Sequence, residues 1–122
     1  MCASFSRLQN LNWGRMTEGE ISKVKEYGMK HLRFALRLYE LQMEMGLYFL
    51  HEHPHCASSW GMPEVKEVME LDGVEVTRGD MCAFGMLQED EHGVGLVKKP
   101  TGFMTNSEEI ARRLKQNCPG GH

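Results

Sequence analysis

The sequence predicts a single α/β domain with a sheet of about three strands flanked by helices. Its 122 residues suffice for one hydrophobic core, and no linker or internal repeat divides residues 1–122. The patterns follow in the order helix, strand, helix, strand, strand, helix, which is typical of an α/β fold but several strands short of a full doubly wound sheet. The strand expected at residues 47–52 organises the rest, because its apolar run ends directly in Glu52-His53-Pro54.

A long helix is expected at residues 17–45, after a loop at residues 1–16. Thr17 and Glu20 match a capping box, in which each side chain satisfies a free backbone N–H, and Gly46 is a suitable stop. Charged residues repeat along one narrow stripe, while nearly every other position after Leu32 is apolar: Phe34, Ala35, Leu36, Leu38, Tyr39, Leu41, Met43 and Met45. Because one sheet face cannot cover so wide an apolar arc, we expect the helix either to be sandwiched or to cover a partner.

Shorter elements fill residues 47–116. A second helix is expected at residues 64–71 after Pro63, and its inward-facing residues would be Val65, Val68, Met69 and Leu71. Strands are expected at residues 74–81 and 95–104, with an acidic connection at residues 88–95 between them. A second capping signal at residues 105–109 precedes a helix at residues 110–116, and residues 117–122 form a tail without further pattern.

Composition limits the classes of function. A formal net charge of -3 and a pI near 6.1 argue against binding nucleic acid by bulk electrostatics, so any such contact would have to be local. No apolar run approaches the roughly 18 residues that span a membrane, and no signal-peptide pattern is visible. We therefore expect an intracellular protein, cytoplasmic or nuclear, with no membrane partner. Cys2, Cys56, Cys82 and Cys118 form no CxxC pair and are expected to be reduced thiols.

Three segments together resemble cytosine-5 DNA methyltransferases. Cys2-Ala3-Ser4-Phe5-Ser6 is similar to the nucleophile loop of that family, and Glu52-His53-Pro54 is similar to its Glu-Asn-Pro or Glu-Asn-Val motif. The third segment resembles the family's aromatic-glycine turn and basic motif: Asp80-Met81-Cys82-Ala83-Phe84-Gly85, Lys98-Lys99-Pro100-Thr101 and Thr105-Asn106. The segments come in the family's order, and phage-type members and methyltransferase-like parts of transposable-element polyproteins are the most similar.

The resemblance implies a role for each matched residue. A cytosine-5 enzyme adds a thiolate to C6 of a flipped-out cytosine so that C5 can take a methyl group, and Cys2 would be this thiolate. Glu52 would be the acid that contacts the N3 and N4 edge of the base. The substrate-binding residues would be His53, Lys98, Lys99 and Thr101, the two lysines steadying the nucleophile loop and a nearby phosphate.

The departures from the family are as informative as the matches. The family binds S-adenosylmethionine through a glycine-rich turn and an acidic residue, and this sequence contains neither. The resemblance therefore implies a partial Rossmann-like methyltransferase sheet that lacks its cofactor-binding half. In the family's strand order the three expected strands are neighbours, with residues 95–104 in the middle. Residues 47–52 would then have a bare edge, where a second chain or another copy could pair.

Several readings compete. The first is a methyltransferase-like fragment that transfers no methyl group alone and is completed by another chain, with DNA as its substrate. The second is a non-catalytic dimerisation or protein-interaction module. The third is a small zinc domain, whose candidate ligands would be His51, His53, His55, Cys56, Cys82, Cys118 and His122, although their spacing matches no standard zinc module.

The simpler alternatives for single residues also stay open. Cys2 could be a terminal cysteine in a flexible leader, and Glu52 could be one half of a salt bridge to Lys98 or Lys99. Trp13 and Trp60 lie in expected loops, where their rings could stack on bases.

Overall fold

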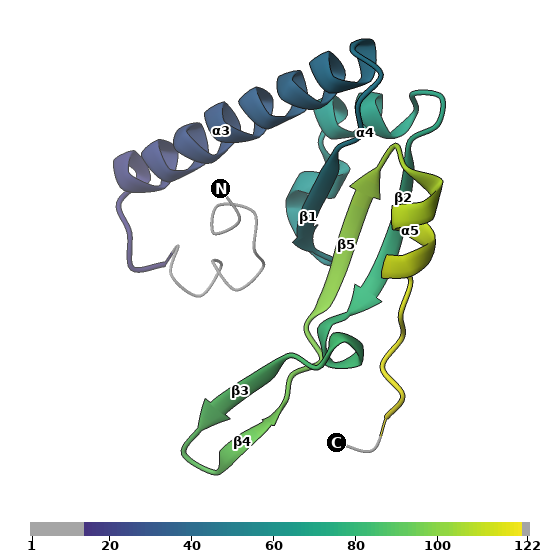
Figure 1. Ribbon diagram of the computed structural model, residues 1–122. Coiled ribbons are helices and arrows are strands. Elements are labelled where there is room, and N and C mark those ends of the chain that lie inside the picture. The colour runs from purple at the N-terminus through teal and green to yellow at the C-terminus, as the bar shows by residue number, and fades with distance from the viewer. Residues whose placement is uncertain (1–13, 121–122) are drawn as a thin grey trace.

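The computed structural model describes residues 14–120, which form two helical layers around a small sheet (Figure 1). The long helix α3 (Glu18–Glu44) begins at the predicted cap, where Thr17 Oγ1 accepts a hydrogen bond of 3.2 Å from Glu20 N. It ends before Gly46, whose φ of 73° suits the residue after a helix. The predicted long helix is therefore confirmed to within a residue at each end.

The central sheet contains β1 (Leu50–Pro54), β5 (Pro100–Thr105) and β2 (Glu75–Asp80), in the order β1-β5-β2. Both outer strands pair antiparallel with β5, and Glu52 and Thr77 both lie opposite Phe103. The expected neighbours are thus observed, with the last strand in the middle. Because β1 and β2 each run opposite to β5, they run parallel to one another.

The sheet is not the parallel sheet of a Rossmann fold. Every strand pairing in residues 14–120 is antiparallel, so the fold is mixed α/β with a small antiparallel sheet and helices. The sequence predicted strands at the segments of β1, β2 and β5, but strand direction depends on how the connections cross the sheet. Along the sequence, the helix α4 (Pro63–Met69) connects β1 to β2, whereas a hairpin comes between β2 and β5.

β1 begins three residues later than predicted, for a reason visible in its hydrogen bonds. Asn106 Oδ1 accepts from Phe49 N at 2.9 Å, and Asn106 Nδ2 donates to Leu47 O at 3.0 Å. Thr105 Oγ1 donates to Phe49 O at 2.6 Å. Side chains therefore form the hydrogen bonds to these backbone N–H and C=O groups that a neighbouring strand would otherwise form.

The predicted acidic loop at residues 88–95 is wrong. This segment forms a hairpin of β3 (Leu87–Asp90) and β4 (Gly93–Leu96), which projects from the end of the sheet in Figure 1. Asp90 Oδ1 accepts from His92 N at 2.7 Å in its turn, and Gly93 has a φ of 115°. All strand residues of the hairpin are exposed, so their sequence shows no burial pattern. The single strand expected at residues 95–104 is divided between β4 and β5.

The core lies between one sheet face and the helices α3 and α4. Its buried residues are Leu32, Leu36, Phe49, Ala57, Val65, Val68 and Met104. Val65 and Val68 of α4 face inward as predicted, but Leu71 lies beyond the helix and is 41% exposed. None of the helices in the described part of the chain is long and apolar enough to cross a membrane.

The opposite sheet face is covered by α5 (Glu108–Leu114), which follows the Ser107 cap. A Cβ at Gly79 would lie 2.5 Å from Leu114 O, so the backbone after α5 passes directly over β2 at a position that only glycine allows. The strands β1 and β2 end, and β5 begins, at the same end of the sheet.

Candidate functional site

β1 separates two chemically different faces, because successive side chains of a strand alternate between them. His51 and His53 are buried at 2% and 0% exposure, whereas Glu52 between them is exposed on the other face. The acid and the histidines therefore cannot act on the same side of the sheet.

The buried face carries a network of aromatic and polar side chains. Tyr39 Oη lies 2.7 Å from His51 Nδ1, and His53 Nδ1 lies 2.7 Å from Ser59 Oγ in the 3₁₀ helix η2 (Ser58–Gly61). Trp60 packs edge-on against both imidazoles and donates a 2.9 Å hydrogen bond to Pro54 O. These contacts fix β1 between α3 and η2, and they place Trp60 inside the fold rather than in a free loop.

Burial keeps both imidazoles neutral near pH 7. Burial, and then the neighbouring His53, lower the pKa of His51 to about 4. Burial also lowers the pKa of His53. Within residues 14–120, His51 Nε2 is buried with no hydrogen-bond partner. His53 was predicted to bind substrate, but the structure places its ring in the core and away from Glu52.

Glu52 lies in the middle of β1 and its side chain is exposed, on the same sheet face that α5 covers over β2 and β5. Its register partners on the same face are Phe103 and Thr77, which are both uncharged. Within residues 14–120 no lysine or arginine forms an ion pair with it, so the alternative of a salt bridge to Lys98 or Lys99 is not observed. The carboxylate is free to meet a group supplied from outside these residues.

The basic motif lies at the end of the sheet where β1 ends and β5 begins. Lys98 and Lys99 are exposed and precede β5, while their carbonyl oxygens accept from Met81 N at 2.7 and 3.4 Å. Thr101 pairs with Pro54, two positions beyond Glu52, and shares the face of Glu52. However, Thr101 is fully buried and its Oγ1 donates to Lys99 O at 3.1 Å, so this hydroxyl holds the lysine turn.

Of the predicted site residues, the structure leaves Glu52 exposed in the middle of β1, and Lys98 and Lys99 exposed just before β5. It assigns His53 and Thr101 to internal contacts. Cys2, Trp13 and His122 lie outside the described residues. Among residues 14–120 no three histidine, cysteine or acidic side chains are close enough to share a metal ion, so this part of the chain gives the zinc reading no support.

A polar cluster that the sequence did not single out lies where β2 ends. Asp80 is buried, and its carboxylate accepts from Cys118 N at 2.7 Å and from Arg78 Nη2 at 3.3 Å. The Cys118 backbone N–H and the Arg78 guanidinium hold the pKa of Asp80 below its usual range, against the effect of burial. The only signal in the sequence was that Arg78 and Asp80 are two positions apart, so that both lie on the same face of a strand.

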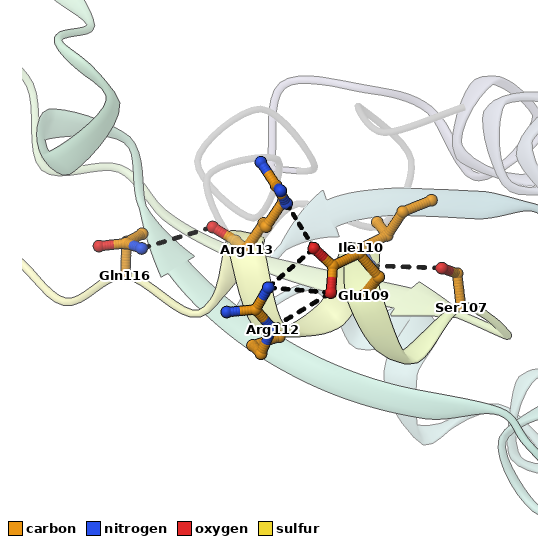
Figure 2. A network of polar contacts seen from close by, with 6 residues as sticks. All are labelled: Ser107, Glu109, Ile110, Arg112, Arg113 and Gln116. Atoms are coloured by element: carbon orange, nitrogen blue, oxygen red, sulfur yellow. Dashed lines mark hydrogen bonds and ion pairs between the residues drawn. The ribbon is translucent and has the colours of Figure 1, made fainter.

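Two arginines on α5 share one carboxylate. Figure 2 shows Glu109 between Arg112 and Arg113, with N–O distances of 2.8 Å to Arg112 Nη2 and 2.7 Å to Arg113 Nε. Hydrogen bonds from Arg113 and then Arg112 lower the pKa of Glu109. Because these side chains are exposed, the pairs contribute little to stability, and they leave few free cations on α5 to bind phosphate.

Comparison of the chain with protein-family models, with curated proteins and with solved structures found no match.

Proposed function

We propose that this chain is the C-terminal half of a cytosine-5 DNA methyltransferase-like domain, which is completed by a cofactor-binding segment and transfers no methyl group without it. The observation that carries this proposal is the open edge of β1. Within residues 14–120 β1 pairs only with β5, so its outer edge is available to another strand.

The sheet is compatible with such an extension. A parallel strand added beside β1 would give a mixed sheet in which β5 is the antiparallel member, and mixed sheets are common among large α/β proteins. In open α/β sheets ligands bind outside the carboxyl ends of parallel strands, and Glu52 lies two residues before that end of β1. The strand order also supports the resemblance, because β5 occupies the central position that the family's order requires.

The proposed chemistry divides between the two halves. Cys2 supplies the thiolate that adds to C6 of cytosine, and Glu52 protonates or hydrogen-bonds the N3 and N4 edge as charge develops there. Lys98 and Lys99 contact a DNA phosphate near the flipped base. S-adenosylmethionine binds on the other half. His53 supports Glu52 only indirectly, because its contact with Ser59 on the opposite face holds β1 in place.

The test is a complementation assay. The full chain is co-expressed with a separate cofactor-binding half of a phage-type cytosine-5 methyltransferase, then mixed with S-adenosylmethionine and DNA that contains 5-fluorocytosine. Fluorine at C5 blocks the final elimination, so an active cysteine stays covalently attached to C6. We expect a covalent protein–DNA complex with both halves, none with this chain alone, and none with Cys2→Ser.

Glu52→Gln should reduce the rate of complex formation by about 100-fold, because a positioned acid contributes roughly that factor or more. The matched control is Glu75→Gln, an exposed acid on the same sheet face, which should react as the wild type does. Methyl transfer by the isolated chain would contradict the proposal that it is incomplete. Equal rates for the Glu52 and Glu75 variants would remove the catalytic role of Glu52.

A second candidate, a non-catalytic dimerisation module, is favoured by the outer surface of α3. Figure 1 shows the N-terminal half of α3 extending away from the sheet. The exposed apolar side chains of α3 include Tyr27 at 61% and Phe34 at 65%. Light scattering of the isolated chain distinguishes the two functions: a dimer that Phe34→Asp dissociates, while the exposed hairpin control Val94→Asp does not, would favour the module.

A further inference from the structure

The segment after α5 returns to the end of β2 and is held there by two backbone contacts. Asp80 N donates to Gln116 O at 2.7 Å, and Cys118 N donates to Asp80 Oδ2 at the same distance. The 3₁₀ helix η3 (Met81–Phe84) begins directly after Asp80 and contains Cys82. Cys82 and Cys118, which lie far apart in the sequence, are therefore both held next to Asp80, the first through the chain and the second through a hydrogen bond.

The two cysteines lie near each other and differ in exposure. Neither is part of a disulfide; Cys82 is buried and Cys118 is partly exposed. Each thiol shifts the pKa of the other, which requires the two side chains to be close. A reagent in solution can thus reach the Cys118 sulfur before the Cys82 sulfur.

The surroundings favour thiolate at the outer position. The Cys82 thiol, then the Gly120 backbone N–H and the Lys98 ammonium, lower the pKa of Cys118, although burial and the charge of Asp80 oppose them. Burial, and then the hydrogen bond to Cys118, raise the pKa of Cys82. Since thiolate is the form that attacks a disulfide, Cys118 has the character of the attacking thiol and Cys82 that of the resolving thiol.

We propose that Cys82 and Cys118 are a redox-active pair that a small-molecule disulfide, such as oxidised glutathione, converts into an intramolecular disulfide. The Cys118 thiolate attacks one sulfur of oxidised glutathione, forms a mixed disulfide and releases one glutathione thiolate. Cys82 gives its proton to solvent, and its sulfur attacks Cys118 Sγ. The second glutathione then leaves as a thiolate and takes up a proton. Two protein thiols become one protein disulfide, and the two electrons they lose reduce one oxidised glutathione to two thiols.

This disulfide would tie the segment after α5 covalently to the end of β2. In the reduced protein that segment depends on the two contacts at Asp80. The same end of the sheet carries Lys98, whose carbonyl oxygen accepts from Met81 N. Oxidation therefore acts on the end where the exposed lysines lie, and it requires no residue of the proposed methyltransferase chemistry.

The experiment is to incubate the full folded chain with oxidised glutathione, alkylate the remaining thiols and map the disulfides by peptide mass spectrometry. We expect Cys82 linked to Cys118, Cys56 alkylated, and full reversal by dithiothreitol. A stable mixed disulfide on Cys118 in the wild-type chain, a disulfide between two chains, or continued alkylation of both cysteines would each overturn the proposal.

Variants test the order of the two steps. Cys82→Ala should stop at the mixed disulfide on Cys118, whereas Cys118→Ser should slow modification of Cys82 by about tenfold or more, because that thiol is buried and protonated. The matched control Cys56→Ser removes an exposed thiol and should leave the Cys82–Cys118 disulfide unchanged. If Cys82→Ala does not fold, Cys118→Ser decides, since rapid modification of Cys82 in that variant would overturn the assigned order.

Discussion

Gly102 shows how a single missing side chain admits the aromatic ring that closes the core. It lies in the central strand opposite His53, and a Cβ there would lie 2.7 Å from Trp60 Cζ2 and 3.0 Å from Trp60 Cε2. The indole cannot readily move away, because its Nε1 donates a hydrogen bond to Pro54 O. The Trp60 ring therefore approaches too closely for any residue but glycine at position 102. The backbone conformation does not require glycine there, because it is ordinary for a strand.

Gly102→Ala should lower the free energy of unfolding by about 1–3 kcal/mol, the usual cost of forcing an extra carbon into a packed core. Urea unfolding followed by circular dichroism measures this loss. Gly95→Ala is the matched control, because Gly95 also lies in a strand and nothing stands within 4 Å of its added Cβ. Equal stability of the two variants would show that the Trp60 ring can shift at no cost.

At the scale of elements, side chains of Thr105 and Asn106 join the end of β5 to the chain that enters β1. Asn106 serves both the N–H of Phe49 and the carbonyl of Leu47 with one amide. This contact explains why β1 begins only at Leu50. It also connects the end of the central strand to the start of an outer strand that is far away in the sequence.

Asn106→Ala should cost about 1–3 kcal/mol of unfolding free energy, since it leaves the Phe49 N–H without its acceptor in a partly buried place. The Phe49 amide should also exchange its hydrogen faster in the variant, which nuclear magnetic resonance can follow. Gln116→Ala is a suitable control, because that exposed amide makes one weak bond of 3.4 Å to Arg113 O. A stability loss as large in the control would mean that the contact is not specific to Asn106.

Local patterns predicted the elements far better than their arrangement. The Thr17 cap and the charge spacing defined α3, and the apolar run before Glu52 indicated the strand β1. The β3–β4 hairpin was missed because its exposed residues carry no hydrophobic alternation. Strand direction could not be predicted either, since it is decided by contacts between distant segments.

The candidate site divides in the same way. Glu52 and Lys98 were identified from motifs, and the register of β1 with β5 brings their segments to one end of the sheet. The burial of His53 could not be foreseen, because it depends on η2 folding back over the strand. The Asp80 cluster was missed because Cys118 reaches it only through the return of the chain after α5.

For the whole molecule, the two buried histidines make stability depend on pH. In the unfolded chain an imidazole binds a proton as pH falls through about 6.5, whereas burial lowers the pKa of folded His51 to about 4. Between these values the unfolded state binds more protons than the folded state, so acid favours unfolding. The lowered pKa of His53 acts in the same direction. The lowered pKa values of Asp80 and Glu109 remove stability only at still lower pH, where carboxylates become protonated.

The free energy of unfolding should therefore be highest near pH 7 and fall steadily below about pH 6.5. His51 alone should account for a loss of about 3 kcal/mol by pH 4, because each unit of pKa difference corresponds to roughly 1.4 kcal/mol. Urea titrations at a series of pH values measure the slope. His51→Phe should flatten the decline, because the phenyl ring cannot bind a proton. His55→Asn, which removes an exposed imidazole, should leave the slope as in the wild type. A flat profile in the wild-type chain would mean that water or another segment already reaches His51 Nε2 in the folded protein.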